Sequence, residues 1–599
     1  MVEIAPDGAP RDRSSREAGR AVLPPWFGFG LAAVVSASAA IAIVYRSRPQ
    51  DTQWSAVALW AAGLALWCLA CRAPADERAR RARLRRADLV AMAALAAIAA
   101  ALILPSLEIY PLMIANDPVR DGGLLARWIA DGEITRIFDY GYYGGYSLLV
   151  PLLGVPFYWM FPTSSLAFKG LAALAGIVAP PLLFFWARRF LPLTLSAAAA
   201  LLMLALPVYL FYARSEPVVA FNPLLMIAVL GALIAALEPN VPARKLGLLG
   251  ALAGLSVYFH GGVKVAGFAA LGLAALVALW RACTCAHRWK RAVSGGATAL
   301  LGVLIGFGPL LQVTDLDRFV SRQRLGHPGL GLQLHTVLED YETSLHVFFD
   351  QPTTSWFPKR QPLIPSPALA GLFAFGAALG FLAVPLRIYW TVLFFALLLP
   401  LTNSAMTDFV NNDHRLTPLL PVIAVATAAG LGAVWRAAAW LRNRWAIRAV
   451  EVVTLSSVLL AAAGPAYRFF SEEQGRRPDL DNHLLYFALS EIESTPVLRQ
   501  APELCVGGNA TTTATMGLLH VRDGWKFFLP GKTIHAAELR PAAAPNELYI
   551  STTCEPKASD DVWSGTAFCT EPALFVCPAR ETGAKDVRIY VDTGAAPPG

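Results

Sequence analysis

The sequence predicts a polytopic α-helical membrane protein with about 13 transmembrane helices and a small extracytoplasmic α/β domain at its C-terminal end. Of its 599 residues, 56% are hydrophobic and only 15% are charged, and the mean hydropathy is +0.49. A soluble protein of this composition would expose large apolar surfaces to water. The apolar segments show almost no strand-like alternation, which favours a helical bundle over a closed barrel.

Apolar segments long enough to cross a bilayer as helix, about 17–25 residues, recur along the chain. The full-length segments lie at 26–45, 54–72, 88–110, 166–187, 193–213, 217–236, 296–313, 366–386, 416–435 and 447–464. We expect three shorter segments, 246–260, 264–280 and 388–402, to cross as well.

The arginines predict the orientation of these helices. The net charge is +8, but the basic residues lie between apolar segments and not along one amphipathic face, so we expect no nucleic-acid partner. If each apolar segment crosses the membrane once, one side carries the N-terminal tail, Arg387 and the basic segments 72–86, 281–291 and 436–448. The positive-inside rule makes that side cytoplasmic, in an integral protein of a bacterial inner membrane. The apolar segment 147–161 would reverse this parity, so we expect it to be re-entrant or to lie at the outer surface.

Four regions follow from these patterns. They are a cytoplasmic tail (1–25), a transmembrane hairpin with a basic cytoplasmic loop (26–87), a transmembrane domain (88–470, with outer loops 111–146 and 314–365) and an extracytoplasmic soluble domain (471–599). The last region alternates polar and apolar residues as strands do. Its four cysteines, an even number on the oxidising side, predict two disulfides of undetermined pairing: Cys505, Cys554, Cys569 and Cys577.

The first outer loop carries two acids. Asn116-Asp117-Pro118 is typical of a helix start, and segment 118–132 has the apolar face of a surface helix. Asp117 and Asp121 would then project to the same side. Capping alone is an alternative role for Asp117, but it does not explain Asp121.

Further charged residues lie at other outer helix ends. Glu216 stands between two predicted helices, and could also be a solvated capping acid. His260 and Lys264 flank two glycines, and the alternative for Lys264 is snorkelling to lipid headgroups. His414 and Arg415 precede a predicted helix, where they could also be interfacial anchors. Cations that neutralise a phosphate leaving group, beside a carboxylate that accepts a proton, are the groups needed to move a sugar from a phosphate carrier.

In their order and sidedness, four segments resemble the GT-C superfamily of polyprenyl-phosphate-sugar-dependent glycosyltransferases, which includes protein O-mannosyltransferases and lipid A aminoarabinose transferases. The segments are "NDPVRDGGLLARWIADGEI", "PVYLFYARSE", "GLLGALAGLSVYFHGGVK" and "HRLTPLLPVIAVATAAGLG". The resemblance implies that Asp117 is a catalytic base or metal contact, with Asp121 as its neighbour and Glu216 as a second catalytic acid. It also implies that Lys264 and Arg415 lie near the carrier phosphate.

We expect His260 and His414 to belong to the same phosphate site. The implied partners are a polyprenyl-phosphate-sugar donor, a lipid, glycan or protein acceptor on the outer face, and membrane lipids. No cofactor is certain. The three acids, Asp117, Asp121 and Glu216, could hold Mg²⁺ or Mn²⁺.

Two other functions remain open. A lipid or glycolipid transporter or flippase would also have many membrane helices, and a non-enzymatic envelope assembly factor could use the last domain for binding. In the second long outer loop, His335, Glu339, Glu342 and His346 recur at helical spacing. A solvated surface helix is the favoured interpretation of this pattern, and a metal site is the alternative.

Overall fold

The computed structural model describes most of the membrane region and five separate stretches of the C-terminal region. The described residues are 25–48, 50–72, 85–107, 123, 125–138, 148–161, 166–239, 241–284, 289–312, 334–351, 362–382, 384–406, 413–441, 443–468, 470, 500–508, 533–536, 547–551, 564–567 and 588–592.

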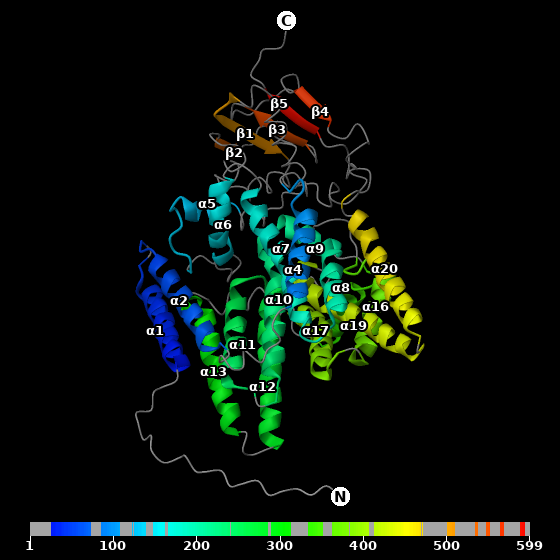
Figure 1. Cartoon of the computed structure of the whole chain (residues 1–599). Helices are drawn as coiled ribbons and strands as arrows, with labels where there is room; N and C mark the ends of the chain where they lie inside the picture. Colours follow the sequence, from blue (N-terminus) through cyan, green and yellow to red (C-terminus); the bar gives the residue numbers. More distant parts are fainter. Residues whose placement is uncertain are drawn as a thin grey trace, which may run out of the picture.

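A bundle of apolar helices forms the body of the molecule, as the sequence predicted (Figure 1). Every segment predicted to cross the membrane contains helix. The bundle helices are α1 (Pro25–Arg46), α2 (Trp54–Ala70), α4 (Arg86–Ile103), α7 (Leu166–Ala187), α8 (Leu193–Leu204), α9 (Pro207–Ser215), α10 (Pro217–Ala236), α11 (Ala243–Leu255), α12 (Gly261–Thr284), α13 (Trp289–Phe307), α16 (Pro367–Leu379), α17 (Leu386–Met406), α19 (Leu420–Ala438) and α20 (Arg444–Arg468).

Within the described residues, eight helices are long and apolar enough to cross a membrane. A ninth span results if α8 and α9, which meet at a bend of 64°, count as one. The bend comes directly before Pro207, whose ring cannot continue the hydrogen-bond ladder of α8. Shorter apolar helices, α2 and α16 among them, account for further predicted crossings. The total of 13 stays a prediction.

Two short helices lie beside each other at one end of the bundle, α5 (Leu125–Ala130) and α6 (Leu149–Met160) (Figure 1). Leu125, Ala126 and Ile129 are buried and pack with Val155 of α6 in one apolar cluster. The predicted surface helix with an apolar face is therefore confirmed over 125–130. Helix α6 has 12 residues, or about 18 Å at the α-helical rise, which is shorter than a hydrocarbon core.

The described strands form one mixed five-stranded sheet, which lies beyond the end of the bundle where α5 and α6 lie (Figure 1). Its order is β2-β1-β3-β5-β4, with β1 parallel to β2, β3 parallel to β5, and the β1–β3 and β4–β5 pairs antiparallel. The strands are β1 (Glu503–Gly508), β2 (Thr533–Ala536), β3 (Glu547–Ser551), β4 (Ser564–Ala567) and β5 (Arg588–Asp592). Cys505 in β1 is buried and disulfide-bonded, and the other three late cysteines lie outside the described residues.

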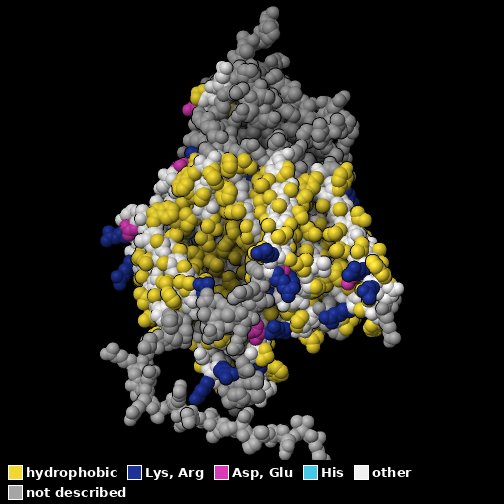
Figure 2. Space-filling view, in the orientation of Figure 1, with side chains coloured by type: hydrophobic (Ala, Val, Ile, Leu, Met, Phe, Trp, Pro, Cys, Tyr) yellow, Lys and Arg dark blue, Asp and Glu magenta, His cyan; other side chains and the backbone are white. Residues whose placement is uncertain are grey.

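Hydrophobic side chains cover the bundle face seen in Figure 2, and most Lys and Arg side chains of this face lie in its lower half, away from the sheet. Glu238, just after α10, contacts three basic residues. Its carboxylate pairs with Lys245 and lies 3.9 Å from Arg387, and its backbone carbonyl accepts a hydrogen bond from Arg281 at 3.1 Å. Arg281 and Arg387 therefore share one end of the bundle, as the arginine pattern predicted. We call this the Glu238 end.

Small residues allow α11 and α13 to pack backbone against backbone. A Cβ added to Gly302 of α13 would overlap the carbonyl oxygen of Gly247 and lie 2.9 Å from the backbone nitrogen of Ala251. Apolar burial drives helix association weakly inside a membrane, so close contact between small residues carries more of the stability.

We predict that Gly302→Ala lowers the thermal stability of the detergent-purified protein, because the added methyl group has no space and overpacking costs about 1–3 kcal/mol. Gly296→Ala is the matched control on the same helix, since a Cβ at Gly296 meets nothing within 4 Å. The control should melt at or above the wild-type temperature in a thermal unfolding assay. Equal melting temperatures for the two variants would contradict the packing argument.

Candidate functional site

The first turn of α12 forms one side of the candidate site. The carbonyl oxygen of His260 accepts hydrogen bonds from the backbone N–H groups of Val263 (3.2 Å) and Lys264 (3.4 Å), so the helix starts here. The N–H groups of Gly261 and Gly262 precede the first intrahelical bond and have no acceptor within the helix. The start of a 24-residue helix is also its positive dipole end, which favours a bound anion.

Gly262 allows a second segment to approach this turn. A Cβ at Gly262 would overlap the carbonyl oxygen of Arg415 and lie 3.0 Å from the Cγ of Pro418. Arg415 belongs to the short helix α18 (Asp413–Leu416), which continues through η7 (Thr417–Leu419) into α19. Two segments about 150 residues apart in sequence thus meet at backbone distance.

The four predicted phosphate-site residues come together around this contact. The imidazole rings of His260 and His414 lie edge to face, with their centroids 4.8 Å apart. His260 is buried, and Lys264 and Arg415 lie close enough to interact electrostatically with its imidazole. We call His260, Lys264, His414 and Arg415 the α12 basic cluster.

Asn222 of α10 supports the turn that carries His414 and Arg415. This fully buried amide donates from Nδ2 to Thr417 Oγ1 at 2.8 Å and to the carbonyl oxygen of His414 at 3.4 Å. Thr417 Oγ1 in turn donates to the same His414 carbonyl at 2.9 Å. These bonds fix the His414–Thr417 backbone against α10.

Glu216 lies on the same helix as Asn222, six residues earlier, which is about 9 Å along the axis. It is 7% exposed, and its carboxylate accepts no capping hydrogen bond from the first turn of α10. The interpretation of Glu216 as a solvated capping acid is therefore wrong on both counts. Burying a carboxylate costs free energy that a solvated cap would not incur, so we expect a different role.

Lys169, in the first turn of α7, is a buried cation that sequence reasoning missed, and it is 1% exposed. Ala172 of α7 packs in one cluster with Ala220 of α10. Lys169 and Glu216 each precede that contact by about one turn, so the two buried charges lie at the same level of neighbouring helices. A lone lysine at the start of an apolar helix looks like an interfacial anchor in the sequence, and no local signal marks it as buried.

The remaining predicted site residues cannot be placed. Asp117 and Asp121 lie outside the described residues. The part of the chain that the structure describes contains no group of three or more His, Cys, Asp or Glu side chains arranged to hold a metal ion.

The predicted surface helix of the second outer loop is α15 (Leu334–His346). The side chains of His335 and Glu339 are 83% and 62% exposed and lie 3.4 Å apart, and His346 lies 2.9 Å from Asp350. The solvated interpretation of this helix is confirmed.

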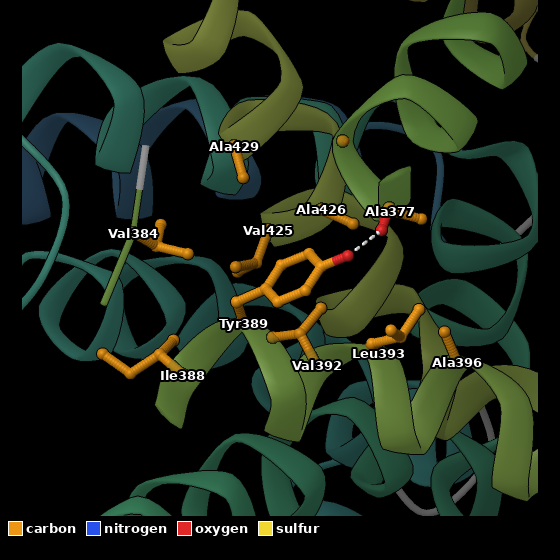
Figure 3. A pocket seen from close by; sticks show the side chains of 11 residues that line it. Ala377, Val384, Ile388, Tyr389, Val392, Leu393, Ala396, Val425, Ala426 and Ala429 are labelled. Carbon is orange, nitrogen blue, oxygen red and sulfur yellow. Dashed lines mark hydrogen bonds between the residues drawn. The ribbon is translucent and has the colours of Figure 1, made fainter. Parts of the chain in front are cut away.

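An apolar cavity between α16, α17 and α19 lies away from these charges (Figure 3). Its lining includes Val425 and Ala429, which are about 15–21 Å along the helix direction from Arg415. The hydroxyl of Tyr389, its one polar side-chain group, donates to the carbonyl oxygen of Ala377 at 2.5 Å. The cavity therefore offers apolar contact and no group suited to phosphate or sugar.

No protein-family model matches the sequence, and no curated protein matches it. Among solved structures, the chain is similar to ArnT from Cupriavidus metallidurans bound to undecaprenyl phosphate, at 15% identity over 76% of this chain and 86% of that chain, with a TM-score of 0.47. The apo structure of the same protein gives 15% identity over 75% and 85% of the two chains and a TM-score of 0.42. At this level of similarity, the likeness assigns neither a family nor a reaction to this chain.

We predict that Gly262→Ala separates α12 from the Arg415 turn, because the methyl group would overlap the Arg415 carbonyl. Gly261→Ala is the control, since a Cβ there meets nothing within 4 Å. Anion protection against thermal unfolding, measured with polyprenyl phosphate, should be lost in Gly262→Ala and kept in Gly261→Ala. Full protection of both variants would show that the close approach is not needed for the site.

Proposed function

We propose that this protein transfers a sugar from a polyprenyl-phosphate-linked donor to a hydroxyl-bearing acceptor, at the end of the bundle opposite the Glu238 end. The acceptor is a lipid, glycan or protein. The observation that supports the proposal most is the α12 basic cluster.

The chemistry of the cluster favours a phosphate. Two basic side chains, Lys264 and Arg415, share one site with the imidazole of His260, which interacts electrostatically with both. Like charges in a partly buried site repel one another, and an anion between them removes that repulsion. Arginine binds phosphate oxygens in a bidentate fork, whereas lysine contributes a point charge.

The position of the cluster favours an anion that carries a hydrocarbon tail. Lys264 lies in the first turn of α12, and α19 follows the turn that carries Arg415. Both helices belong to segments long and apolar enough to span a membrane. A phosphate held at those helix ends can keep a prenyl tail in the bilayer beside them. A free sugar nucleotide has no such tail.

The proposed reaction needs few protein groups. The bond between the sugar's anomeric carbon and the phosphate oxygen breaks, and the acceptor oxygen forms the new bond to that carbon. The polyprenyl phosphate leaves with the bonding electron pair, and Lys264 and Arg415 stabilise its negative charge. A carboxylate takes the proton from the acceptor hydroxyl. Asp117 is our candidate base, with Asp121 to orient it and Glu216 as a buried second acid.

A divalent cation is compatible with this proposal but no step depends on it. Glu216 supplies one buried carboxylate, and Asp117 and Asp121 would supply the others. Mg²⁺ or Mn²⁺ bound there would add positive charge beside the donor phosphate.

The distribution of buried charge favours an enzyme over a transporter. A transporter is expected to carry ionisable groups midway along its helices. The buried ionisable side chains of the described bundle helices instead lie in first or last turns: Asp88, Lys169 and Arg214, with Glu216 at a junction.

We predict that Lys264→Gln or Arg415→Gln weakens binding of polyprenyl phosphate about tenfold or more, the effect of losing a charged hydrogen bond of about 1.5–3 kcal/mol. Titration of the purified protein, followed by tryptophan fluorescence, measures the affinity. Lys290→Gln is the control. Lys290 is an exposed cation in the first turn of α13, which follows the C-terminal end of α12, far from Lys264. Wild-type affinity in both cluster variants would reject the phosphate site.

We further predict that Asp117→Asn lowers the turnover of sugar transfer by about 10²-fold or more while donor binding is retained, since an amide cannot accept the proton. Glu216→Gln should also lower turnover with binding retained. Glu339→Gln, on the exposed face of α15, serves as the control and should transfer sugar at the wild-type rate. Normal transfer by a folded Asp117→Asn protein would reduce that residue to a helix cap.

A further inference from the structure

Arg214, in the last turn of α9, is fully buried and binds the end of another helix. Its Nη1 donates to the carbonyl oxygens of Leu102 (3.0 Å) and Ile103 (2.8 Å), and its Nη2 donates to that of Pro105 (2.8 Å). Leu102 and Ile103 end α4, where the last carbonyls have no partner within the helix. A guanidinium satisfies several of them at once and opposes the negative end of the helix dipole.

The backbone that Arg214 holds is strained. Ser106, directly after Pro105, has a φ of 53°, the one left-handed non-glycine residue in the described part of the chain. Such a conformation is costly for a residue with a Cβ and persists only where surrounding contacts fix it. Arg214 supplies contacts immediately before it. The first outer loop, with Asp117, begins after this turn.

Arg214 also contacts the C-terminal end of the bundle. Its guanidinium carbon lies 5.7 Å from the centroid of the Phe470 ring, within the range of a cation–π interaction. Phe470 follows α20, packs against the main apolar core, and stands directly before segment 471–599. Glu216 is two residues after Arg214 and starts α10.

We propose that Arg214 is a positioning residue that couples the C-terminal segment to the reaction site. It contacts or adjoins three parts: the strained turn after α4, the α9–α10 junction with Glu216, and Phe470. A change at Phe470 is thereby transmitted to the start of the first outer loop. The catalytic part of this inference rests on the proposed transfer reaction, whereas the mechanical coupling does not.

The kinetic test compares two arginine caps, the fully buried Arg214 and the partly buried Arg281. Arg281 is the matched control, because it donates to the carbonyl oxygens of Leu237 (2.8 Å) and Glu238 (3.1 Å) and so caps the end of α10 at the Glu238 end. Arg214→Gln should lower kcat about tenfold or more with the KM for donor within twofold, since small misplacements of catalytic groups are costly in rate. Arg281→Gln should lower thermal stability comparably and leave kcat unchanged. Arg214→Lys, which keeps the charge but loses the fork, should lie between Arg214→Gln and wild type.

The coupling test does not require enzyme activity. Ser106→Cys places a thiol on the strained turn. Its reaction rate with a membrane-impermeant maleimide rises when the turn becomes less ordered. Phe470→Leu, which removes the ring but keeps apolar bulk, should raise that rate, as should Arg214→Gln. The double variant should react no faster than Arg214→Gln alone, because both changes break one contact.

The outcomes separate this inference from the proposed function. If Lys264→Gln leaves polyprenyl phosphate binding intact, the proposed function fails, yet faster labelling in Phe470→Leu still supports the coupling. Unchanged labelling in Phe470→Leu overturns the coupling even if sugar transfer is found. An equal loss of kcat in Arg214→Gln and Arg281→Gln would show Arg214 to be a structural cap only.

Discussion

The end of the bundle opposite the Glu238 end depends on one contact, the approach of Gly262 to the backbone of Arg415 and the ring of Pro418. A side chain at position 262 would push α12 away from the α18 turn and separate the rings of His260 and His414. Asn222 holds the same turn from the other side through Thr417. The cluster is therefore positioned by backbone packing and neutral hydrogen bonds.

Much of this arrangement could be predicted from the sequence. Bilayer thickness fixes the length of an apolar helix, so the helices were found from hydropathy, and arginine parity placed the predicted site residues at one end. The meeting of His260 and His414 followed from that sidedness. The close approach at Gly262 could not be predicted, because the sequence does not show which segment packs against a glycine. The Gly261-Gly262 pair also does not reveal which of the two residues has to be small.

The buried charges were the harder part. Lys169 was missed, and Glu216 was given a solvated alternative, because burial depends on helices that the local sequence does not specify. Arg214 shows the same limit, since its acceptors at the end of α4 lie more than 100 residues earlier in the chain. Desolvating a charge is expensive unless its partners are fixed in advance, so a buried charge is a three-dimensional feature that hydropathy cannot separate from an interfacial anchor.

Charged side chains are needed in the bundle for structure and binding, but hydrocarbon disfavours them. Placing them at helix ends satisfies both conditions. Midway along a helix, a cation facing hydrocarbon would cost several kcal/mol, on the order of +2.5–3.5 on insertion scales. In a first or last turn, the same cation meets unpaired backbone groups and the helix dipole, as Arg214 does at α4 and Arg281 at α10. Arg214 and Arg281 thus each cap the end of a helix, one at each end of the bundle. At the end opposite the Glu238 end, the start of α12 places Lys264 beside Arg415 at a dipole end that prefers anions, and the proposed phosphate site rests on this combination.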